Sequence, residues 1–236
     1  MATQGSYKGI HQSNAVQHPV EYEQMIYQKG LQYERPPFSF RSQDWESQAE
    51  ERMSAESRGY VVGNAGTGET ARKNREAFSK WSIVPRRLIK TEGLPDMTAN
   101  VLDHCLQFPI ALAPVGVQRM FLLHSWLLIS HTNSNQQRIG IFNPDGEEAT
   151  ARAAAKQNVP YIMSTASSTS IEDVAKANGK GVRWFQLYWP RNEHNDITVS
   201  LLHRAKNAGF TALVVTLDTY ILGWRPSDMD NGYFMA

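Results

Sequence analysis

The segment RWFQLYWP, late in the chain, carries a glutamine and a tyrosine two residues apart. On an extended strand, alternate side chains share a face, so Gln186 and Tyr188 point to one side and Leu187 and Trp189 to the other. A glutamine amide both donates and accepts hydrogen bonds, which suits the edge of a flavin or a pyrimidine, and a phenol can hydrogen-bond a substrate oxygen. Aromatic strands are more often simply part of a core, so the pattern leaves both interpretations open.

Two charged residues follow a later apolar run, because TLDTYILGWRP contains Asp218 and Arg225. An ion pair would be explanation enough for them. An arginine at the ligand-binding edge of a sheet could equally clamp a carboxylate through two parallel hydrogen bonds. These two interpretations also stay open on the residues alone.

Three glycines, Gly63, Gly66 and Gly68, suggest a nucleotide-binding loop in GYVVGNAGTGETARKNREAF. The lysine–serine or lysine–threonine pair of a P-loop does not follow them, and the β-branched pair before them is too short for a dinucleotide fingerprint. The pattern favours a flexible turn that leads into a charged helix starting near Glu69.

Apolar, strand-like runs that alternate with helical patterns are needed to position these groups. The runs are FPIALAPVG at 108–116, VPYIMST at 159–165, VRWFQLYW at 182–189 and TALVVTLD at 211–218. Between them, EEATARAAAKQN, SIEDVAKANG and DITVSLLHRAKNAG have helical spacing, and the last two end in glycine. This alternation predicts right-handed βαβ units on a parallel sheet.

Polar side chains gather at the carboxyl ends of the last three runs. They are Ser164 and Thr165, then Gln186 and Tyr188, then Thr216 and Asp218. An open doubly wound sheet and a (β/α)8 barrel both bind ligands at that edge. Several strands that each contribute a side chain, without a glycine-rich fingerprint at the first turn, favour the barrel. The predicted fold class is α/β, a (β/α)8 TIM barrel with about its first four βα units present.

The part before the barrel is expected to be polar and helical. Residues 1–41 read as a polar arm, with one short amphipathic segment that Pro36 and Pro37 stop. Residues 42–108 form a helical segment and lead-in, with a helix predicted over 42–57. Residues 109–236 form the partial barrel.

The composition is that of an ordinary soluble globular protein, with 41% hydrophobic and 20% charged residues. A formal net charge of +1 gives no general attraction to nucleic acid or to an anionic membrane. Cys105 is the single cysteine, no secretory signal pattern opens the chain, and no apolar run approaches the roughly 20 residues of a membrane span. We expect an intracellular protein, whether cytoplasmic, peroxisomal or mitochondrial, with no membrane anchor, nucleic-acid partner or metal site.

Six blocks of the sequence resemble, in order, the FMN-dependent 2-hydroxy-acid dehydrogenase family, which includes glycolate oxidase and lactate 2-monooxygenase. They are KWSIVPRRL, PIALAPVGVQ, NPDGEEATARAAA, STASSTSIEDVA, RWFQLYWP and RAKNAGFTALVVTLDTYILGWRPSDMDNGY. The resemblance implies a TIM barrel that binds FMN and oxidises a small (S)-2-hydroxy acid to a 2-oxo acid or its decarboxylated product. It also implies dioxygen as a candidate electron acceptor and a homotetrameric assembly.

The resemblance assigns cofactor contacts by position. The backbone of Ala113, Pro114, Val115 and Gly116 matches the turn that lies against the flavin ring. Ser164, Gln186 and Thr216 match the polar contacts to the flavin.

It assigns substrate contacts in the same way. Tyr60 and Arg225 match ligands of the substrate carboxylate, Tyr188 the tyrosine beside the substrate hydroxyl, and Asp218 the carboxylate that orients the catalytic histidine. Asn64, near Tyr60, stands where the family usually has a glycine. Ala166 stands where the glycolate-oxidase branch has a bulky aromatic, so the pocket resembles that of lactate oxidase and lactate 2-monooxygenase.

The family's catalytic histidine and second substrate arginine lie in a glycine-rich segment that has no counterpart here, and its phosphate-binding loops follow strands seven and eight. None of the seven histidines has that context, and the five beyond the arm fall in helical or loop surroundings. We therefore expect a truncated chain with weak or no flavin retention and no turnover. Residues 119–139 also lack a family counterpart, and with the early ending they suggest imperfect gene annotation. The competing hypothesis is a catalytically silent binding protein or structural fragment.

Overall fold

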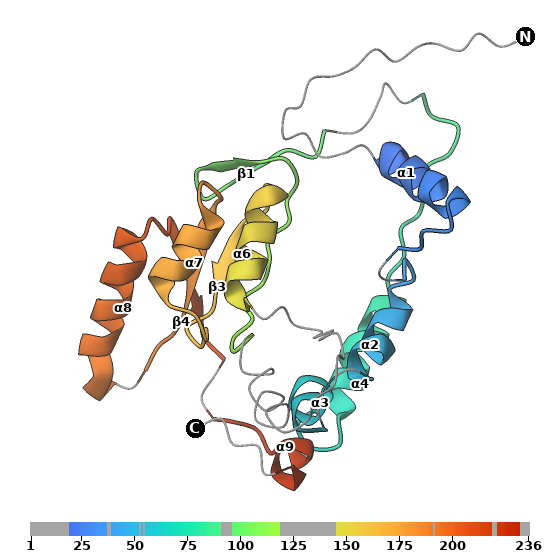
Figure 1. The fold of residues 1–236 in the computed structure, drawn as a ribbon. Coiled ribbons are helices and arrows are strands. Elements are labelled where there is room, and N and C mark those ends of the chain that lie inside the picture. The colour runs from blue at the N-terminus through green and yellow to red at the C-terminus, as the bar shows by residue number, and fades with distance from the viewer. Residues whose placement is uncertain are drawn as a thin grey trace, which may run out of the picture. The chain divides into compact units, whose positions relative to one another are not determined.

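The computed structural model describes residues 19–36, 39–51, 53, 55–90, 96–118, 145–190, 192–218 and 221–231 (Figure 1). The chain divides into two compact units, Met1–Trp45 and Glu46–Ala236. The predicted insertion at 119–139 lies outside the described residues, as does the C-terminal end of the last family-like block.

The first unit contains a helix within the predicted polar arm. Helix α1 (Pro19–Leu31) begins at a proline, whose fixed φ suits a first turn, and it ends before Pro36. The ring of Phe40 packs edge-on against Tyr22 at 6.2 Å between centroids. Trp45 donates its indole N–H to the carbonyl of Ser39 at 2.6 Å, so the segment after α1 folds back on itself.

The single helix predicted over 42–57 is wrong, because two helices occupy the region. Helix α2 (Gln43–Glu50) and helix α3 (Ala55–Val62) have different partners. Glu46 of α2 pairs at 2.8 Å with Arg75 of helix α4 (Glu69–Ser79), whereas α3 packs against helix α9 (Pro226–Asp230). Helix propensity cannot reveal such a split, because tertiary contacts decide it. The predicted helix start near Glu69 is confirmed.

A short antiparallel hairpin precedes the barrel strands and was not predicted. Strands β1 (Ala99–Val101) and β2 (His104–Leu106) pair through Ala99 with Leu106. The two turn residues, Leu102 and Asp103, both have positive φ, at 47° and 63°. Two-residue hairpin turns favour that backbone but usually use asparagine, aspartate or glycine, so the leucine concealed the turn.

Three parallel strands form the sheet that positions the predicted site, in the order β3-β4-β5. They are β3 (Tyr161–Met163), β4 (Arg183–Tyr188) and β5 (Ala212–Thr216). The first predicted strand, 108–116, forms only an isolated parallel bridge from Leu112 to Tyr161. Leu112 both donates to Pro160 O and accepts from Ile162 N, so this run lies where a fourth strand would lie without being one.

The helices between the strands agree with the predicted alternation. They are α6 (Glu147–Lys156), α7 (Ile171–Asn178) and α8 (Asn195–Asn207), with a 3-10 turn, η2 (Asn192–His194), before α8. Ser170 caps α7 by accepting from Asp173 N at 3.1 Å. Gly179 and Gly209 then have positive φ where α7 and α8 turn back to the sheet, which confirms the predicted glycine endings.

The core lies between the sheet and these helices, which pack side by side as α6 on α7 and α7 on α8 (Figure 1). Phe185 and Leu187 of β4 belong to it together with Val174 of α7 and Ala205 of α8. Burying a side chain as large as phenylalanine or leucine stabilises the fold by roughly 1.5–3 kcal/mol. Gln186 lies between two core residues in the sequence and therefore faces the other side of β4, as predicted.

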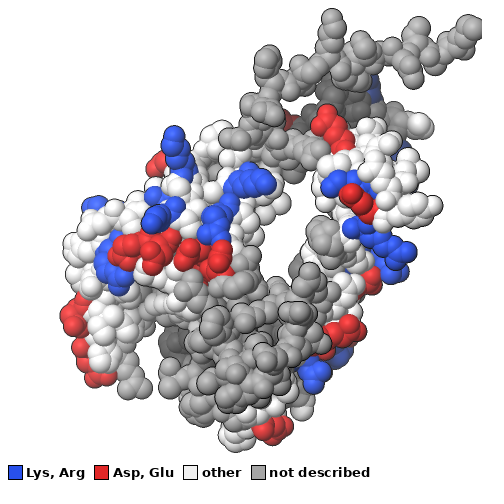
Figure 2. Space-filling model, in the orientation of Figure 1, with Lys and Arg blue, Asp and Glu red and all other residues white. Residues whose placement is uncertain are grey.

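Charged side chains of both signs lie next to one another over these helices in Figure 2. Arg204 of α8 pairs with Glu172 of α7 at 2.7 Å, and Arg152 pairs with Glu148 within α6 at 3.6 Å. These pairs are exposed, so each contributes little to stability. Among the described residues, no helix is long and apolar enough to cross a membrane.

Candidate functional site at the carboxyl ends of the strands

A chain of hydrogen bonds through the Gln186 side chain connects the carboxyl ends of β3, β4 and β5. Gln186 is 1% exposed, and its amide nitrogen donates to Thr216 Oγ1 at 2.9 Å. Its amide oxygen accepts from the backbone N–H of Thr165 at 3.1 Å. With these two bonds made, the amide can still offer a ligand its second N–H.

Thr165 also fixes the position of Tyr188. The hydroxyl of Thr165 donates to the carbonyl of Gln186 and accepts from the backbone N–H of Tyr188 at 3.0 Å. These bonds hold the backbone of Tyr188 in place at the end of β4, and Tyr188 is 42% exposed there. Thr165 was noted as a polar strand end but was not predicted to be a site residue.

The APVG loop, residues 113–118, packs tightly against the β3 loop, residues 164–170. Val117 donates its N–H to Ala166 O at 2.8 Å. A Cβ at Gly116 would lie 2.9 Å from that same oxygen and 3.1 Å from Ala166 Cβ, so only glycine fits without a shift. Val117 has a φ of 48°, which is rare for a β-branched residue and marks a constrained turn. Val115, by contrast, is 52% exposed.

Ser164 lies at the start of the β3 loop and is 3% exposed. Its oxygen accepts from the backbone N–H of Ala166 at 3.1 Å. That bond leaves the hydroxyl hydrogen of Ser164 able to donate elsewhere.

A buried carboxylate holds the two loops together. Glu147, the first residue of α6, is fully buried. It accepts from the backbone N–H of Gln118 at 3.0 Å, from both the N–H and the hydroxyl of Ser168, and from the hydroxyl of Thr169 at 2.7 Å. Burial works against ionisation, but the hydrogen bonds from Ser168 and Thr169 outweigh it and hold the pKa of Glu147 below its usual range.

The predicted carboxylate ligands Tyr60 and Arg225 are in contact although 165 residues separate them. Arg225 donates to the Tyr60 carbonyl, and its guanidinium lies 4.9 Å from the centroid of the Tyr60 ring. It also pairs with Asp228 at 2.8 Å. A second link, from Gly66 N to Trp224 O at 2.7 Å, joins the glycine-rich turn to the same segment.

The Tyr60 hydroxyl is electrostatically coupled to this cluster and to Tyr188. Burial is the main reason that the pKa of Tyr60 is raised. The Arg225 charge counteracts that shift, and Asp228 and Tyr188 add to it. The charges of Arg225 and Asp228 and the Tyr188 phenol therefore all act on the Tyr60 hydroxyl.

Asp218 follows β5 and is exposed. It makes no hydrogen bond or ion pair with any residue in the described part of the chain. Of the histidines described there, His104 lies on β2 rather than in the predicted helix or loop, bonded to Thr211 Oγ1 at 2.9 Å. Neither His194, at the start of α8, nor His203, within it, pairs with Asp218. The structure therefore brings no described histidine into contact with Asp218.

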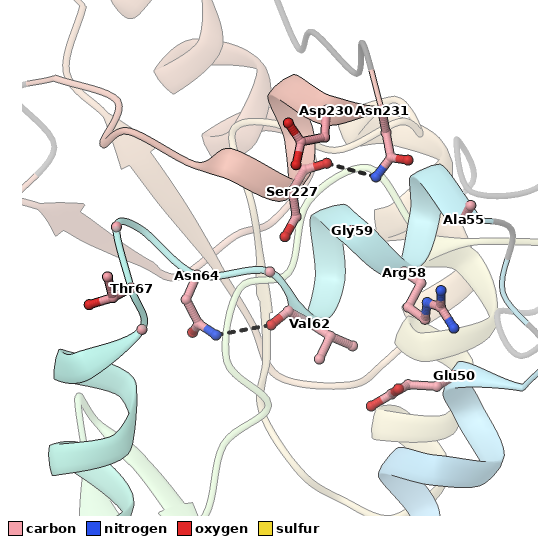
Figure 3. Close-up of a pocket in the computed structure, with 13 residues that line it drawn as sticks. Glu50, Ala55, Arg58, Gly59, Val62, Asn64, Thr67, Ser227, Asp230 and Asn231 are labelled. Carbon is pink, nitrogen blue, oxygen red and sulfur yellow. Dashed lines mark hydrogen bonds between the residues drawn. The ribbon is translucent and has the colours of Figure 1, made fainter.

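A separate hollow of about 580 Å³ lies between α3, the glycine-rich turn and α9 (Figure 3). Its lining includes Arg58, Asn64, Thr67, Ser227 and Asp230. Asn64 and Asn231 both donate their amides to backbone carbonyls rather than into the hollow. None of the eleven residues predicted as site residues lines it, so this hollow is not the predicted site.

Parallel strands alternating with helices, and polar side chains at the strands' carboxyl ends, define the ligand-binding face of a β/α-barrel protein. The sequence from residue 49 onward agrees with this class. The family of FMN-dependent dehydrogenases matches residues 49–137 and 137–236. The chain therefore belongs to the FMN-dependent dehydrogenase family, oxidoreductases that act on CH–OH groups with FMN as cofactor.

Two curated relatives illustrate the extent of the match. An FMN-dependent alpha-hydroxy acid dehydrogenase of Schizosaccharomyces pombe is 53% identical over 215 residues, which are 91% of this chain and 47% of that protein. An L-lactate oxidase of Lysinibacillus sphaericus is 38% identical over 84% of this chain and 45% of its own length. The chain thus spans about half the length of the curated relatives it matches.

Solved structures agree on the fold. A mandelate oxidase with a bound difluorinated 2-hydroxy acid has 32% identity and a TM-score of 0.65, over 82% of this chain and 50% of that one. A chimeric (S)-mandelate dehydrogenase mutant has 29% identity and a TM-score of 0.66, over 82% and 48%. The predicted TIM-barrel class, with only part of the barrel represented, is confirmed.

Proposed function

We propose that this chain carries the flavin-ring and carboxylate-binding part of an FMN-dependent oxidoreductase that oxidises a lactate-like (S)-2-hydroxy acid to a 2-oxo acid. The observation that carries the proposal is the chain from Thr165 through Gln186 to Thr216. It aligns polar groups along three neighbouring strand ends. The exposed Val115 belongs to the APVG loop, which packs against the β3 loop through Val117 and Ala166.

The available donors fit the pyrimidine edge of a flavin. Ser164 and Thr216 each accept one hydrogen bond and retain a hydroxyl hydrogen, and Gln186 retains one amide N–H. The flavin edge offers several acceptors, so a row of neutral donors is the matching chemistry. The half-exposed Val115 and the APVG backbone supply an apolar surface for the ring face.

These donors are all neutral, which leads us to expect that they recognise the ring rather than the phosphate. Ser164, Gln186 and Thr216 carry no charge to pair with a phosphate group. We therefore propose that FMN and riboflavin bind the isolated chain with similar, weak affinity. When bound, FMN would accept the hydride equivalent from the substrate carbon.

The carboxylate of the substrate would be held by Arg225 and Tyr60. Arg225 is oriented by Asp228 and by the Tyr60 carbonyl, and it still has guanidinium N–H groups to donate. A tyrosine phenol is protonated at neutral pH, and the raised pKa of Tyr60 favours that form further, so the phenol can donate as well. Tyr188 would hydrogen-bond the substrate hydroxyl from the end of β4.

Proton removal from the substrate hydroxyl needs a base that Asp218 would orient. Since no described histidine contacts Asp218, we propose that this chain alone binds ligands without turning them over. The small Ala166 side chain stands where the glycolate-oxidase branch has a bulky aromatic, which supports a lactate-like substrate. Dioxygen as acceptor and a homotetramer remain proposals drawn from the family resemblance.

A second candidate function is a protein that binds a ligand but belongs to no catalytic site, even as part of a longer protein. The isolated position of Asp218, exposed and without a described partner, is the observation that favours it. The two functions differ in the effect of added substrate on the visible spectrum of the bound flavin.

The test uses the purified chain with added FMN under anaerobic conditions. We expect saturable quenching of flavin fluorescence, and a shift of the visible spectrum on adding (S)-lactate without bleaching of the flavin. Arg225→Lys should require roughly tenfold more (S)-lactate for the same shift and keep the quenching. Flavin fluorescence that the chain never quenches would refute the flavin site. Bleaching by (S)-lactate, or formation of pyruvate, would refute the proposed lack of turnover.

A further inference from the structure

The buried carboxylate of Glu147 has no cationic partner among the described residues. An ionised carboxylate is expensive to bury unless hydrogen bonds replace the water it loses. Glu147 receives such bonds from Gln118, Ser168 and Thr169, and its place in the first turn of α6 adds favourable dipole interactions.

Glu147 does more than cap its own helix. An acidic residue in a first helical turn commonly faces water and interacts with its own helix end. Besides the N–H of its own backbone, the Glu147 carboxylate accepts from two other segments: Gln118 belongs to the APVG loop, and Ser168 and Thr169 belong to the β3 loop. The carboxylate therefore connects α6 to both loops at once.

The connection extends from Glu147 to the surface proposed to take the flavin ring. Gln118 donates its side-chain amide to the carbonyl of Val115 at 3.0 Å, and its amide oxygen accepts from Thr150 at 2.7 Å. On the other side, the β3 loop carries Ser164 and the carbonyl of Ala166 that receives Val117 N. A shift of either loop would change the distance between the apolar surface at Val115 and the hydroxyl of Ser164.

We propose that Glu147 is a positioning residue for the flavin ring, whose carboxylate holds the APVG loop and the β3 loop at the spacing that ring binding requires. The proposal rests on the proposed function, since only a chain that takes a flavin can show the effect. Glu147 does not touch the ring and acts through Gln118 and Ser168.

The variant Glu147→Gln tests this with little change in size. A glutamine retains one acceptor oxygen but presents an NH2 group to the donors of Gln118 and Ser168, so at least one of those bonds is lost. Glu148→Gln is the matched control, because Glu148 neighbours Glu147 on the same helix but is partly exposed and lies 3.6 Å from the guanidinium of its ion-pair partner Arg152. Thr169→Val is a milder variant that removes one donor and keeps the shape.

The first measurement is amide hydrogen exchange of the chain without flavin. In Glu147→Gln we expect protection of the Gln118 and Ser168 amides to fall about tenfold, which is the loss of one hydrogen bond to a charged acceptor. The amide of Leu187 in β4 should keep its protection, as should every amide in Glu148→Gln. Unchanged protection at Gln118 and Ser168 would overturn the proposal without involving any flavin.

The second measurement titrates each chain into a trace of riboflavin and of FMN and follows fluorescence. We expect Glu147→Gln to weaken both ligands by roughly tenfold, Thr169→Val by a few fold, and Glu148→Gln not at all. At saturation, the visible circular dichroism of the flavin should differ from wild type, which a mere loss of stability would not cause.

The outcomes separate the two proposals. If Glu147→Gln or, should it not fold, Thr169→Val loses amide protection yet binds flavin like wild type, the positioning role is overturned and the proposed function stands. If the wild-type chain quenches neither flavin, the proposed function fails at once, and the positioning role fails with it.

Discussion

Replacing Gly116 by alanine tests the packing between the APVG loop and the β3 loop. The new Cβ would lie 2.9 Å from Ala166 O and 3.1 Å from Ala166 Cβ. The oxygen belongs to the backbone and accepts the 2.8 Å bond from Val117 N, so it cannot rotate away. Overpacking of this kind costs about 1–3 kcal/mol, and we expect Gly116→Ala to lower the free energy of unfolding by that amount.

The assay is urea unfolding followed by circular dichroism, together with the riboflavin titration. Because the APVG loop must move to relieve the contact, flavin affinity should fall roughly 5- to 150-fold, the factor equivalent to the same energy range. Gly30→Ala in α1 is the control, since no atom lies within 4 Å of its added Cβ, and it should leave flavin affinity unchanged.

A double variant shows which contact matters. Adding Ala166→Gly to Gly116→Ala removes the Cβ–Cβ contact but leaves the carbonyl at 2.9 Å, so it should restore only part of the loss. If Gly116→Ala unfolds at the wild-type urea concentration and binds riboflavin with wild-type affinity, the reasoning about the two loops is refuted.

Four further outcomes follow from the site. Gln186→Leu leaves the Thr165 N–H without its acceptor, and we expect a loss of about 1–3 kcal/mol in urea unfolding and much weaker flavin quenching; full stability would contradict the network. Arg225→Lys loses the contact with the Tyr60 ring, so the Kd for (S)-lactate, read from the flavin spectrum, should rise about tenfold, and an unchanged Kd would argue against the carboxylate role. Because the pKa of Glu147 is lowered from 4.5, its ionised form stabilises the fold above pH 4.5, and this contribution is lost as the pH falls through the lowered pKa. Wild type should therefore lose stability on acidification more steeply than Glu147→Gln. Parallel curves of stability against pH for the two proteins would contradict this role of the Glu147 carboxylate. The hydrogen bonds from Arg204 lower the pKa of Glu172 to about 2, so an NMR titration of Arg204→Ala should show it returning toward 4.5, and a normal value already present in wild type would exclude the pairing.

The strand and helix alternation was predictable because each element carries its own periodic pattern. The strands β3, β4 and β5 and the helices α6 and α7 fall within the predicted segments, and α8 begins one residue earlier than predicted, at Asn195. The strand predicted over 108–116 is wrong. Its apolar residues match a strand pattern, but only Leu112 forms a β-bridge. The break between α2 and α3 and the turn at Leu102 depend on tertiary contacts and on unusual backbone angles, which residue types do not reveal.

Part of the site could be predicted from the sequence. Gln186 and Thr216 follow from the positions where strands end, and the contact of Tyr60 with Arg225 followed from the family resemblance rather than from any local pattern. Asp228 could have been suspected from its place three residues after Arg225, a spacing that allows pairing on a helix. Glu147 gave no signal, because an acidic residue in a first helical turn is ordinary and its burial depends on loops that lie 29 and 21 residues away.

The central claim is that the carboxyl ends of β3, β4 and β5, with the APVG loop, take a flavin ring. NMR chemical-shift mapping of the isotope-labelled chain during a riboflavin titration tests it most directly. We predict saturable shifts at Val115, Gly116, Ser164, Gln186 and Thr216, with the hollow between α3 and α9 unaffected. Saturable shifts confined to that hollow, or none at the strand ends, would contradict the claim.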